Sequence, residues 1–128
     1  MKYLLDADAV IDHLSQRIDL PVALPGLAAT TLIEIYTGVY GSRNPRLAEG
    51  QLKRFLRTVT LIPLNQRVIH AAARLRAELR GKNLPITHRA FDLVAAATAR
   101  EYQLTLVTSN IKHFTDIPGL RTLDPRSS

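Results

Sequence analysis

Short apolar runs alternate with segments of helical periodicity along this 128-residue chain, and this alternation constrains the fold more than any other feature. The apolar runs are continuous, which is typical of strands that are buried on both faces of a sheet. Strands alternating with helices predict an α/β fold, with a parallel twisted sheet flanked by helices on both faces. The length fits a single domain over 1–128.

Five strands and five longer helices are expected. The strands are 2–5, 26–30, 58–64, 104–108 and 120–123. The helices are 8–17, 31–40, 46–57, 65–80 and 88–102, followed by a short helical turn over 110–114. Ligands of open parallel sheets bind outside the carboxyl ends of the strands. Asp6 directly follows the first strand and Asn110 lies two residues past the fourth, so we expect both at the same rim.

Three carboxylates follow the first strand in the segment YLLDADAVID. A carboxylate beside a core raises the free energy unless a positive group lies next to it. Asp6 could cap the helix that follows, but capping alone does not explain it. Asp8 lies in the first helical turn, where the helix dipole favours it, so we expect a supporting role. Asp12 is expected to face solvent.

Glu34 and Asp92 each have two interpretations. Glu34 lies among apolar residues, where the spacing Thr31-x-x-Glu34 fits either a capping box or a metal ligand at a helix start. Asp92 lies above a face of small alanines, where it could pair with Arg89 or bind a cation. Because a buried unpaired carboxylate costs several kcal/mol, we expect a cation at Asp92.

The segment VTSN (107–110) ends the fourth strand. Its polar side chains could cap the following turn, or the Thr108 hydroxyl and Asn110 amide could hold a metal-bound water or a phosphate oxygen. Asp and Glu are hard oxygen donors, which favour Mg²⁺, with Mn²⁺ as a substitute. The four histidines form no i,i+4 pair, and we interpret each as a packing or surface residue.

Several classes of protein find no support in the sequence. The chain has no cysteine, which excludes disulfides and agrees with a cytoplasmic location. We expect no signal peptide, since an acid arrives at position 6, and no membrane span, since no apolar run approaches about 20 residues. Walker, G-x-G-x-x-G and G-x-S-x-G motifs are also missing.

Positive charge is concentrated in the middle of the chain, whose net charge is +6. Nine basic residues and a single acid, Glu78, lie between Lys53 and Arg89. Such a stretch is typical of a solvated helix face, and it also suits a polyanion such as nucleic acid.

Three segments carry a family resemblance. YLLDADAVID is similar to an opening strand usually written LLDTNVLI, and TTLIEIYTG is similar to a motif with an acid in a helix before a glycine. The third, from Phe91 to Asp124, matches a D-x-x-I-A-A-x-A run, a strand, T-x-N-x-x-H-F and I-P-G-L. The chain thus resembles the PIN-domain ribonucleases, specifically the VapC-type toxins of toxin–antitoxin pairs, nearly from end to end.

This resemblance implies a PIN-like fold and an acidic catalytic pocket of Asp6, Glu34 and Asp92. Asp6 and Asp92 would be direct ligands of Mg²⁺, and Glu34 would complete the shell directly or through water. Asn110 stands where many members carry a further acid, which weakens the case for a second metal. Asp116, a few residues on, is a candidate replacement.

The implied activity is endonucleolytic hydrolysis of RNA by a metal-activated water, leaving a 5′-phosphate and a 3′-hydroxyl. The substrate would be a tRNA or rRNA loop held by the basic helices. The implied partners are a VapB-type antitoxin and a second copy of the chain, bound through apolar helix surface in 31–57.

Two other functions remain open at this point. LLDADAV also looks like the first motif of haloacid dehalogenase-type phosphatases, in which Asp6 would be the nucleophile and Asp8 a general acid. That family needs a later lysine and acidic pair, and 93–128 offers neither DD nor GDxxxD. A non-catalytic module that binds nucleic acid or a partner is the third possibility.

Overall fold

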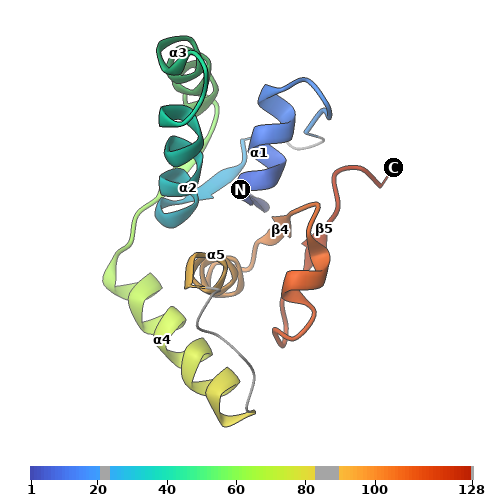
Figure 1. Cartoon of the computed structure of the whole chain (residues 1–128). Coiled ribbons are helices and arrows are strands. Elements are labelled where there is room, and N and C mark those ends of the chain that lie inside the picture. The colour runs from blue at the N-terminus through green and yellow to red at the C-terminus, as the bar shows by residue number, and fades with distance from the viewer. Residues whose placement is uncertain (21–23, 83–89, 128) are drawn as a thin grey trace.

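Five short strands form one parallel sheet in the order β3-β2-β1-β4-β5 (Figure 1). The structure is a computed structural model that describes residues 1–20, 24–82 and 90–127. The strands are β1 (Tyr3–Leu5), β2 (Gly26–Ala28), β3 (Thr60–Ile62), β4 (Thr105–Val107) and β5 (Thr122–Leu123). The helices are α1 (Ala7–Leu14), α2 (Ala29–Tyr40), α3 (Pro45–Leu56), α4 (Gln66–Gly81), α5 (Ala90–Glu101) and the 3₁₀ helix η1 (Ile111–Phe114).

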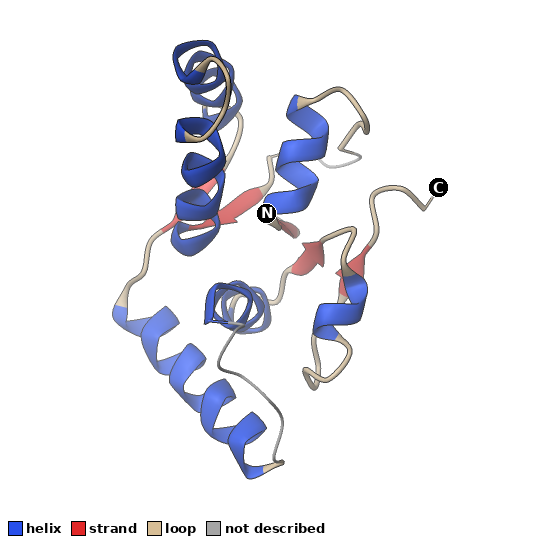
Figure 2. Ribbon diagram, in the orientation of Figure 1, coloured by secondary structure: helices blue, strands red, loops and turns tan. Residues whose placement is uncertain are grey.

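Helices cover both faces of the sheet, which confirms the expected three-layer α/β fold (Figure 2). Neighbouring residues of β1 point to opposite faces. Leu4 packs into a core shared with α4 and α5, and Leu5 packs into a second core shared with α1, α2 and α3. Both leucines are fully buried, so the central strand stabilises the two layers together.

The strand order places a topological switch point at the centre of the sheet. From β1 the chain moves outward through β2 and β3, then returns through α4 and α5 to pair β4 with the free side of β1. The register pairs Leu5 with Val107, so β1 and β4 end side by side. Ligands of open α/β sheets bind at such a point, outside the carboxyl ends of the strands.

Three strands are shorter than expected by two residues or more at an end: β2 ends at Ala28 rather than at residue 30, β3 spans Thr60–Ile62 rather than 58–64, and β5 begins at Thr122 rather than at residue 120. Two helix ends also differ from the expected ones by two residues or more. α1 ends at Leu14 rather than at residue 17, because Gln16 adopts a left-handed conformation with φ of 60°. α2 begins at Ala29 rather than at Thr31, directly after β2, and its N-cap residue Ala28 makes no side-chain capping bond. The capping box between Thr31 and Glu34 is therefore not formed. The expected start of the last long helix, at 88, lies outside the described residues.

Helix starts elsewhere follow standard capping chemistry. The side chain of Asn44 accepts a hydrogen bond from the Leu47 N–H at 3.2 Å, with Pro45 in the first helical position. Asn65 accepts from the Val68 N–H at 2.9 Å and so begins α4. None of the helices in the described part of the chain is both long enough and apolar enough to cross a bilayer.

Candidate metal centre

Three acids from three separate elements meet at the switch point of the sheet. Asp6 is the residue between β1 and α1, Glu34 lies in α2, and Asp92 lies in the first turn of α5. One carboxylate oxygen from each residue lies within 4.8 Å of the other two. The structure therefore brings together the three residues that the sequence nominated for the acidic pocket.

Asp6 is held by the backbone and by one hydroxyl. Its Oδ1 accepts from the Ala7 N–H at 2.9 Å, so the residue caps α1 as the sequence allowed. Its Oδ2 accepts from the Thr108 hydroxyl at 2.9 Å. Burial and the nearby charge of Asp8 raise the pKa of Asp6 to about 6, although the Thr108 and Ala7 bonds act in the opposite direction. These bonds fix the orientation of the carboxylate without neutralising it.

Glu34 experiences the same like-charge environment. Burial, followed by the charges of Asp6, Asp92 and Asp8, raises its pKa to about 7. Asp92 has a different neighbour, since the Nδ1 atom of His113 lies 3.4 Å from its Oδ2. The pairing of Asp92 with Arg89 that the sequence allowed falls on a residue outside the described ranges.

The donor set fits a hard divalent cation. Among the described residues, no lysine or arginine forms an ion pair with any of the three clustered acids. Three carboxylates this close repel one another, and a bound cation would relieve that repulsion. Oxygen ligands at this spacing suit Mg²⁺ or Mn²⁺ better than zinc, which prefers nitrogen and sulfur.

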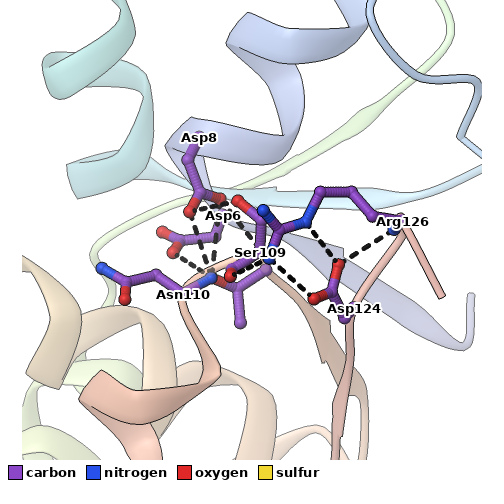
Figure 3. A network of polar contacts seen from close by, with 7 residues as sticks. Asp6, Asp8, Ser109, Asn110, Asp124 and Arg126 are labelled. Carbon is purple, nitrogen blue, oxygen red and sulfur yellow. Dashed lines mark hydrogen bonds and ion pairs between the residues drawn. The ribbon is translucent and has the colours of Figure 1, made fainter.

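A loop at the end of β4 holds two of the acids in place (Figure 3). The Thr108 hydroxyl accepts from the Asn110 N–H at 3.0 Å. It lies closest to Asp6 Oδ2, at 2.9 Å, and is 3.4 and 3.5 Å from the two carboxylate oxygens of Asp8. The Ser109 hydroxyl donates to Asp8 Oδ2 at 2.9 Å, and the Ser109 N–H donates to Asp8 Oδ1 at 3.4 Å. Asp8 is thus held beside the cluster by two hydrogen bonds from Ser109, and its supporting role stays a prediction.

Asn110 reaches the cluster only indirectly. Its side-chain Nδ2 lies 3.0 Å from Nδ1 of His113, the same ring atom that approaches Asp92. Its side chain makes no capping bond to η1, so the capping interpretation of this residue was wrong. Asp116, considered as a replacement acid, is not one of the three clustered carboxylates.

His113 is exposed, which confirms the expected surface position, but it also contacts Asp92, a contact that the sequence analysis did not anticipate. Its contact with Asp92 could have been suspected from the position of the residue in the T-x-N-x-x-H-F segment. Ser109, Asp124 and Arg126 were also missed. Asp124 directly follows β5, as Asp6 follows β1, so the rule about strand ends could have placed it at this rim.

Arg126 and Asp124 form a bidentate ion pair beside the loop over 108–110 (Figure 3). The Arg126 guanidinium donates to both carboxylate oxygens of Asp124, at 3.1 and 2.9 Å, and the Arg126 N–H adds a third bond at 2.9 Å. The bonds from the Arg126 side chain and backbone hold the pKa of Asp124 below its usual range. The guanidinium also donates to the Ser109 carbonyl at 2.9 Å.

The molecule is thus a parallel α/β domain with a cluster of acids at its switch point, where ligands of such sheets bind. The PIN-domain family profile matches residues 3–120, and the chain belongs to that family. Among curated proteins it is 33% identical over 94 residues to Ribonuclease VapC2 of Rickettsia felis, covering 73% of this chain and 69% of that protein. It is 25% identical to the tRNA(fMet)-specific endonuclease VapC of Salmonella typhimurium, covering 97% and 98% of the two chains.

Solved structures agree with the family assignment. The VapBC2 structure from Rickettsia felis, bound to a promoter DNA fragment, matches with a TM-score of 0.84 and 26% identity over 96% of this chain and 98% of that one. A toxin–antitoxin complex from Klebsiella pneumoniae matches with a TM-score of 0.73 and 25% identity over 97% and 98%. These findings confirm the expected VapC-type PIN nuclease class and exclude assignment to the phosphatase family.

Proposed function

We propose that this protein is a Mg²⁺-dependent endoribonuclease and the toxin of a type II toxin–antitoxin pair. The observation that carries the proposal is the convergence of Asp6, Glu34 and Asp92 at the sheet's switch point without an arginine or lysine partner in the described residues. The relatives named as VapC nucleases support the same activity.

Each acid has a proposed task. Asp6 and Asp92 bind the cation, and Glu34 completes its shell directly or through water. Mg²⁺ supplies positive charge for the phosphate and lowers the pKa of a water molecule. Thr108 keeps the Asp6 oxygens oriented by its 2.9 Å hydrogen bond, and His113 lies against Asp92. The RNA 2′-hydroxyl takes no part, so the products carry a 5′-phosphate and a 3′-hydroxyl.

The basic residues of α3 and α4 support RNA as the substrate, but they lie on two different sides of the sheet. α3 packs on one face of the sheet and α4 on the other, so the basic stretch of the sequence becomes two separate surfaces (Figure 1). Several of these residues form no ion pair among the described residues: Arg54, Arg57, Arg76, Arg80 and Lys82. We propose that they hold the RNA backbone, with an affinity that falls as salt rises.

Exposed apolar side chains support protein partners. Ile33, Tyr40 and Leu47 lie in the 31–57 region and are each more than half exposed. Ile33 and Tyr40 line a mainly apolar groove of about 350 Å³ that runs from α2 to Leu61. We propose that this region binds a second copy of the chain or a VapB-type antitoxin. A toxin–antitoxin complex among the similar structures supports an antitoxin as a partner. A cytoplasmic location follows from that pairing.

A cleavage assay with matched variants tests the proposal. Purified protein is incubated with total tRNA and rRNA, with Mg²⁺, with Mn²⁺ or with EDTA, and product ends are mapped. We expect cleavage with either cation, none with EDTA, and none for Asp6→Asn or Asp92→Asn at either cation. Asp12→Asn is the control, because this acid lies on α1 outside the cluster and pairs with Arg17 at 3.7 Å.

Other outcomes favour the competing functions. Cation binding without RNA cleavage under any condition would favour a module that binds nucleic acid or a partner. Hydrolysis of phosphate monoesters with a trapped phospho-Asp6 would favour the phosphatase chemistry, despite the family assignment. Retention of RNA cleavage by Asp6→Asn would contradict the proposed role of the cluster.

A further inference from the structure

The segment that follows β5 returns to the rim of the sheet and attaches to the loop over 108–110. Arg126 binds Asp124 through both carboxylate oxygens and also donates from Nη2 to the Ser109 carbonyl at 2.9 Å. A guanidinium presents its donors in a rigid planar fork, so a bidentate partner on one side fixes the direction of the remaining donor. Asp124 therefore orients Arg126 toward Ser109.

The same loop holds the acids on its other side. Ser109 donates twice to Asp8, and Thr108 donates to Asp6 at 2.9 Å. The Thr108 hydroxyl also lies 3.4 and 3.5 Å from the two Asp8 oxygens, and it accepts from the Asn110 N–H at 3.0 Å. The orientation of both carboxylates thus depends on the path of three consecutive backbone units, and Arg126 fixes the middle one.

Arg126 acts on the loop through its hydrogen bonds, while the charges of Asp124, Asp12 and Asp8 also act on its guanidinium. Within the part of the chain that the structure describes, Arg126 forms an ion pair with Asp124 alone, and its distances to Asp6 and Asp8 exceed the range of an ion pair. Its positive charge is balanced by Asp124, so it does not replace a cation in the acid cluster. Arg126 is more than half exposed, and this exposure weakens its electrostatic effect on the cluster further.

We propose that Arg126, oriented by Asp124, is a positioning residue of the metal centre. It anchors the Ser109 carbonyl, and the anchored 108–110 loop holds Asp6 and Asp8 in the arrangement that accepts a divalent cation. This inference rests on the proposed metal-dependent function, but it concerns the affinity for the cation and not the cleavage of RNA. Outer partners of ligands commonly set metal affinity in this way.

Calorimetric titration with Mn²⁺ alone tests the inference. Arg126→Ala is compared with Arg121→Ala, a matched control, since Arg121 also donates to a backbone carbonyl, that of Gln103 at 2.7 Å, before β5. We expect Arg126→Ala to weaken Mn²⁺ binding by about three- to tenfold, less than the loss of a direct outer partner. Arg121→Ala should bind Mn²⁺ like the unaltered protein, and Arg126→Lys, which lacks the fork, should be intermediate.

Amide hydrogen exchange provides a readout without metal. Exchange of the Ser109 and Asn110 amides should accelerate in Arg126→Ala and stay unchanged in Arg121→Ala, because only the former releases the loop. A folded Arg126→Ala variant with unchanged Mn²⁺ affinity would overturn the inference. An equal loss of Mn²⁺ affinity in Arg126→Ala and Arg121→Ala would also overturn it. If Arg126→Ala fails to fold, Arg126→Lys and Asp124→Asn decide the question by the same criteria.

The two proposals fail in different ways. Unaltered protein that binds Mn²⁺ but cuts no RNA would contradict the ribonuclease function, and the comparison of Arg126→Ala with Arg121→Ala would still decide the role of Arg126. Unaltered protein that binds no Mn²⁺ would overturn both.

Discussion

Helix α5 carries an acid near each end, and the two acids have opposite surroundings. Asp92, in the first turn, and Glu101, the last residue, have similar side-chain exposure, at 22% and 28%. Glu101 pairs with Arg67 at 3.1 Å and with Arg74 at 3.5 Å. Asp92 faces two other carboxylates and a histidine. The two acids therefore differ in the charges around them and not in their exposure.

The charge of Glu101, at the end of α5, is compensated by residues of the chain itself. Arg67 also lies over the ring of Tyr102, with 4.1 Å between the guanidinium carbon and the ring centroid, and donates to the Glu101 carbonyl at 3.2 Å. These contacts join the start of α4 to the end of α5, and two arginines together compensate the negative charge of Glu101. At the Asp92 end, the described residues place no lysine or arginine against the carboxylate, and its neighbours are two further acids and His113.

We expect the largest difference between the two ends of α5 when the charge of Asp92 or of Glu101 is removed. Asp92→Asn should reduce RNA cleavage by more than about a hundredfold, since even outer partners of metal ligands are worth about 10- to 100-fold. Glu101→Gln should leave cleavage within about twofold, because exposed ion pairs contribute about 1 kcal/mol or less. Initial cleavage rates at saturating Mg²⁺ measure both. Equal losses would show that the two ends of α5 do not differ in function.

A positive charge placed within the acid cluster should compensate Asp92 as the two arginines compensate Glu101. In the unaltered protein, Mn²⁺ at a hundred times its dissociation constant should stabilise the fold by about 2.7 kcal/mol. Glu34→Lys places an ammonium group beside Asp6 and Asp92 and should abolish this stabilisation. Urea unfolding with and without Mn²⁺ measures the effect. A full Mn²⁺ response in Glu34→Lys would show that the cation binds elsewhere.

Acidification should weaken the cation site before it affects the Glu101 ion pairs. The pKa of Asp6 is raised to about 6 and that of Glu34 to about 7, so protons compete with the cation in this range. Mn²⁺ affinity should fall by more than about tenfold between about pH 7.5 and 5.5. Titration calorimetry at several pH values checks this. A constant affinity across that range would contradict the assignment of these two acids as ligands.

The same two acids should give the metal-free protein an unusual pH response. Because their pKa values are higher in the folded state, the folded protein binds more protons than the unfolded chain between about pH 4 and 7. Their contribution to stability is complete below about pH 4 and is lost as the pH rises to about 7. Glu34→Gln should flatten this decline, as measured by urea unfolding in EDTA. A decline of unchanged steepness would count against Glu34 as its source.

The smallest effect concerns the stability of the Glu101 end. Glu101→Gln removes ion pairs whose arginines are more than half exposed, so we expect a loss of about 0.5–1 kcal/mol in the free energy of unfolding. The loss should shrink in 1 M NaCl, where screening acts on exposed charges. A loss above about 3 kcal/mol would indicate a buried network rather than a surface pair.

The order of the elements and the site of the acids were readable from the sequence because each rests on local patterns. Continuous apolar runs indicated parallel strands, and Asp6 directly after a strand indicated the rim. The convergence of Glu34 with Asp6 was not fixed by local residues, which allowed a capping box equally well. That alternative failed because α2 follows β2 without a loop, so the helix starts two residues before the expected cap.

Contacts between residues far apart in the sequence could not be predicted from local sequence patterns. The bond from Arg126 to Ser109 spans 17 residues and depends on where β5 directs the segment after it. The division of the basic stretch between α3 and α4 likewise depends on which face of the sheet each helix covers. Periodicity places a residue on a helix, but only tertiary packing tells which neighbours that helix meets.

The small residues of α5 link the inside of the domain to its chemistry. Ala96 and Ala99 are fully buried, and α5 lies against α4 and the central strands. A larger side chain at Ala96 would push the helix outward like a wedge, and Asp92 at its start would move with it. The small size of these alanines thus lets α5 pack closely against the sheet, with Asp92 beside the other two acids. Substitutions that move Asp92 are therefore limited by how much larger the buried side chains under α5 can become.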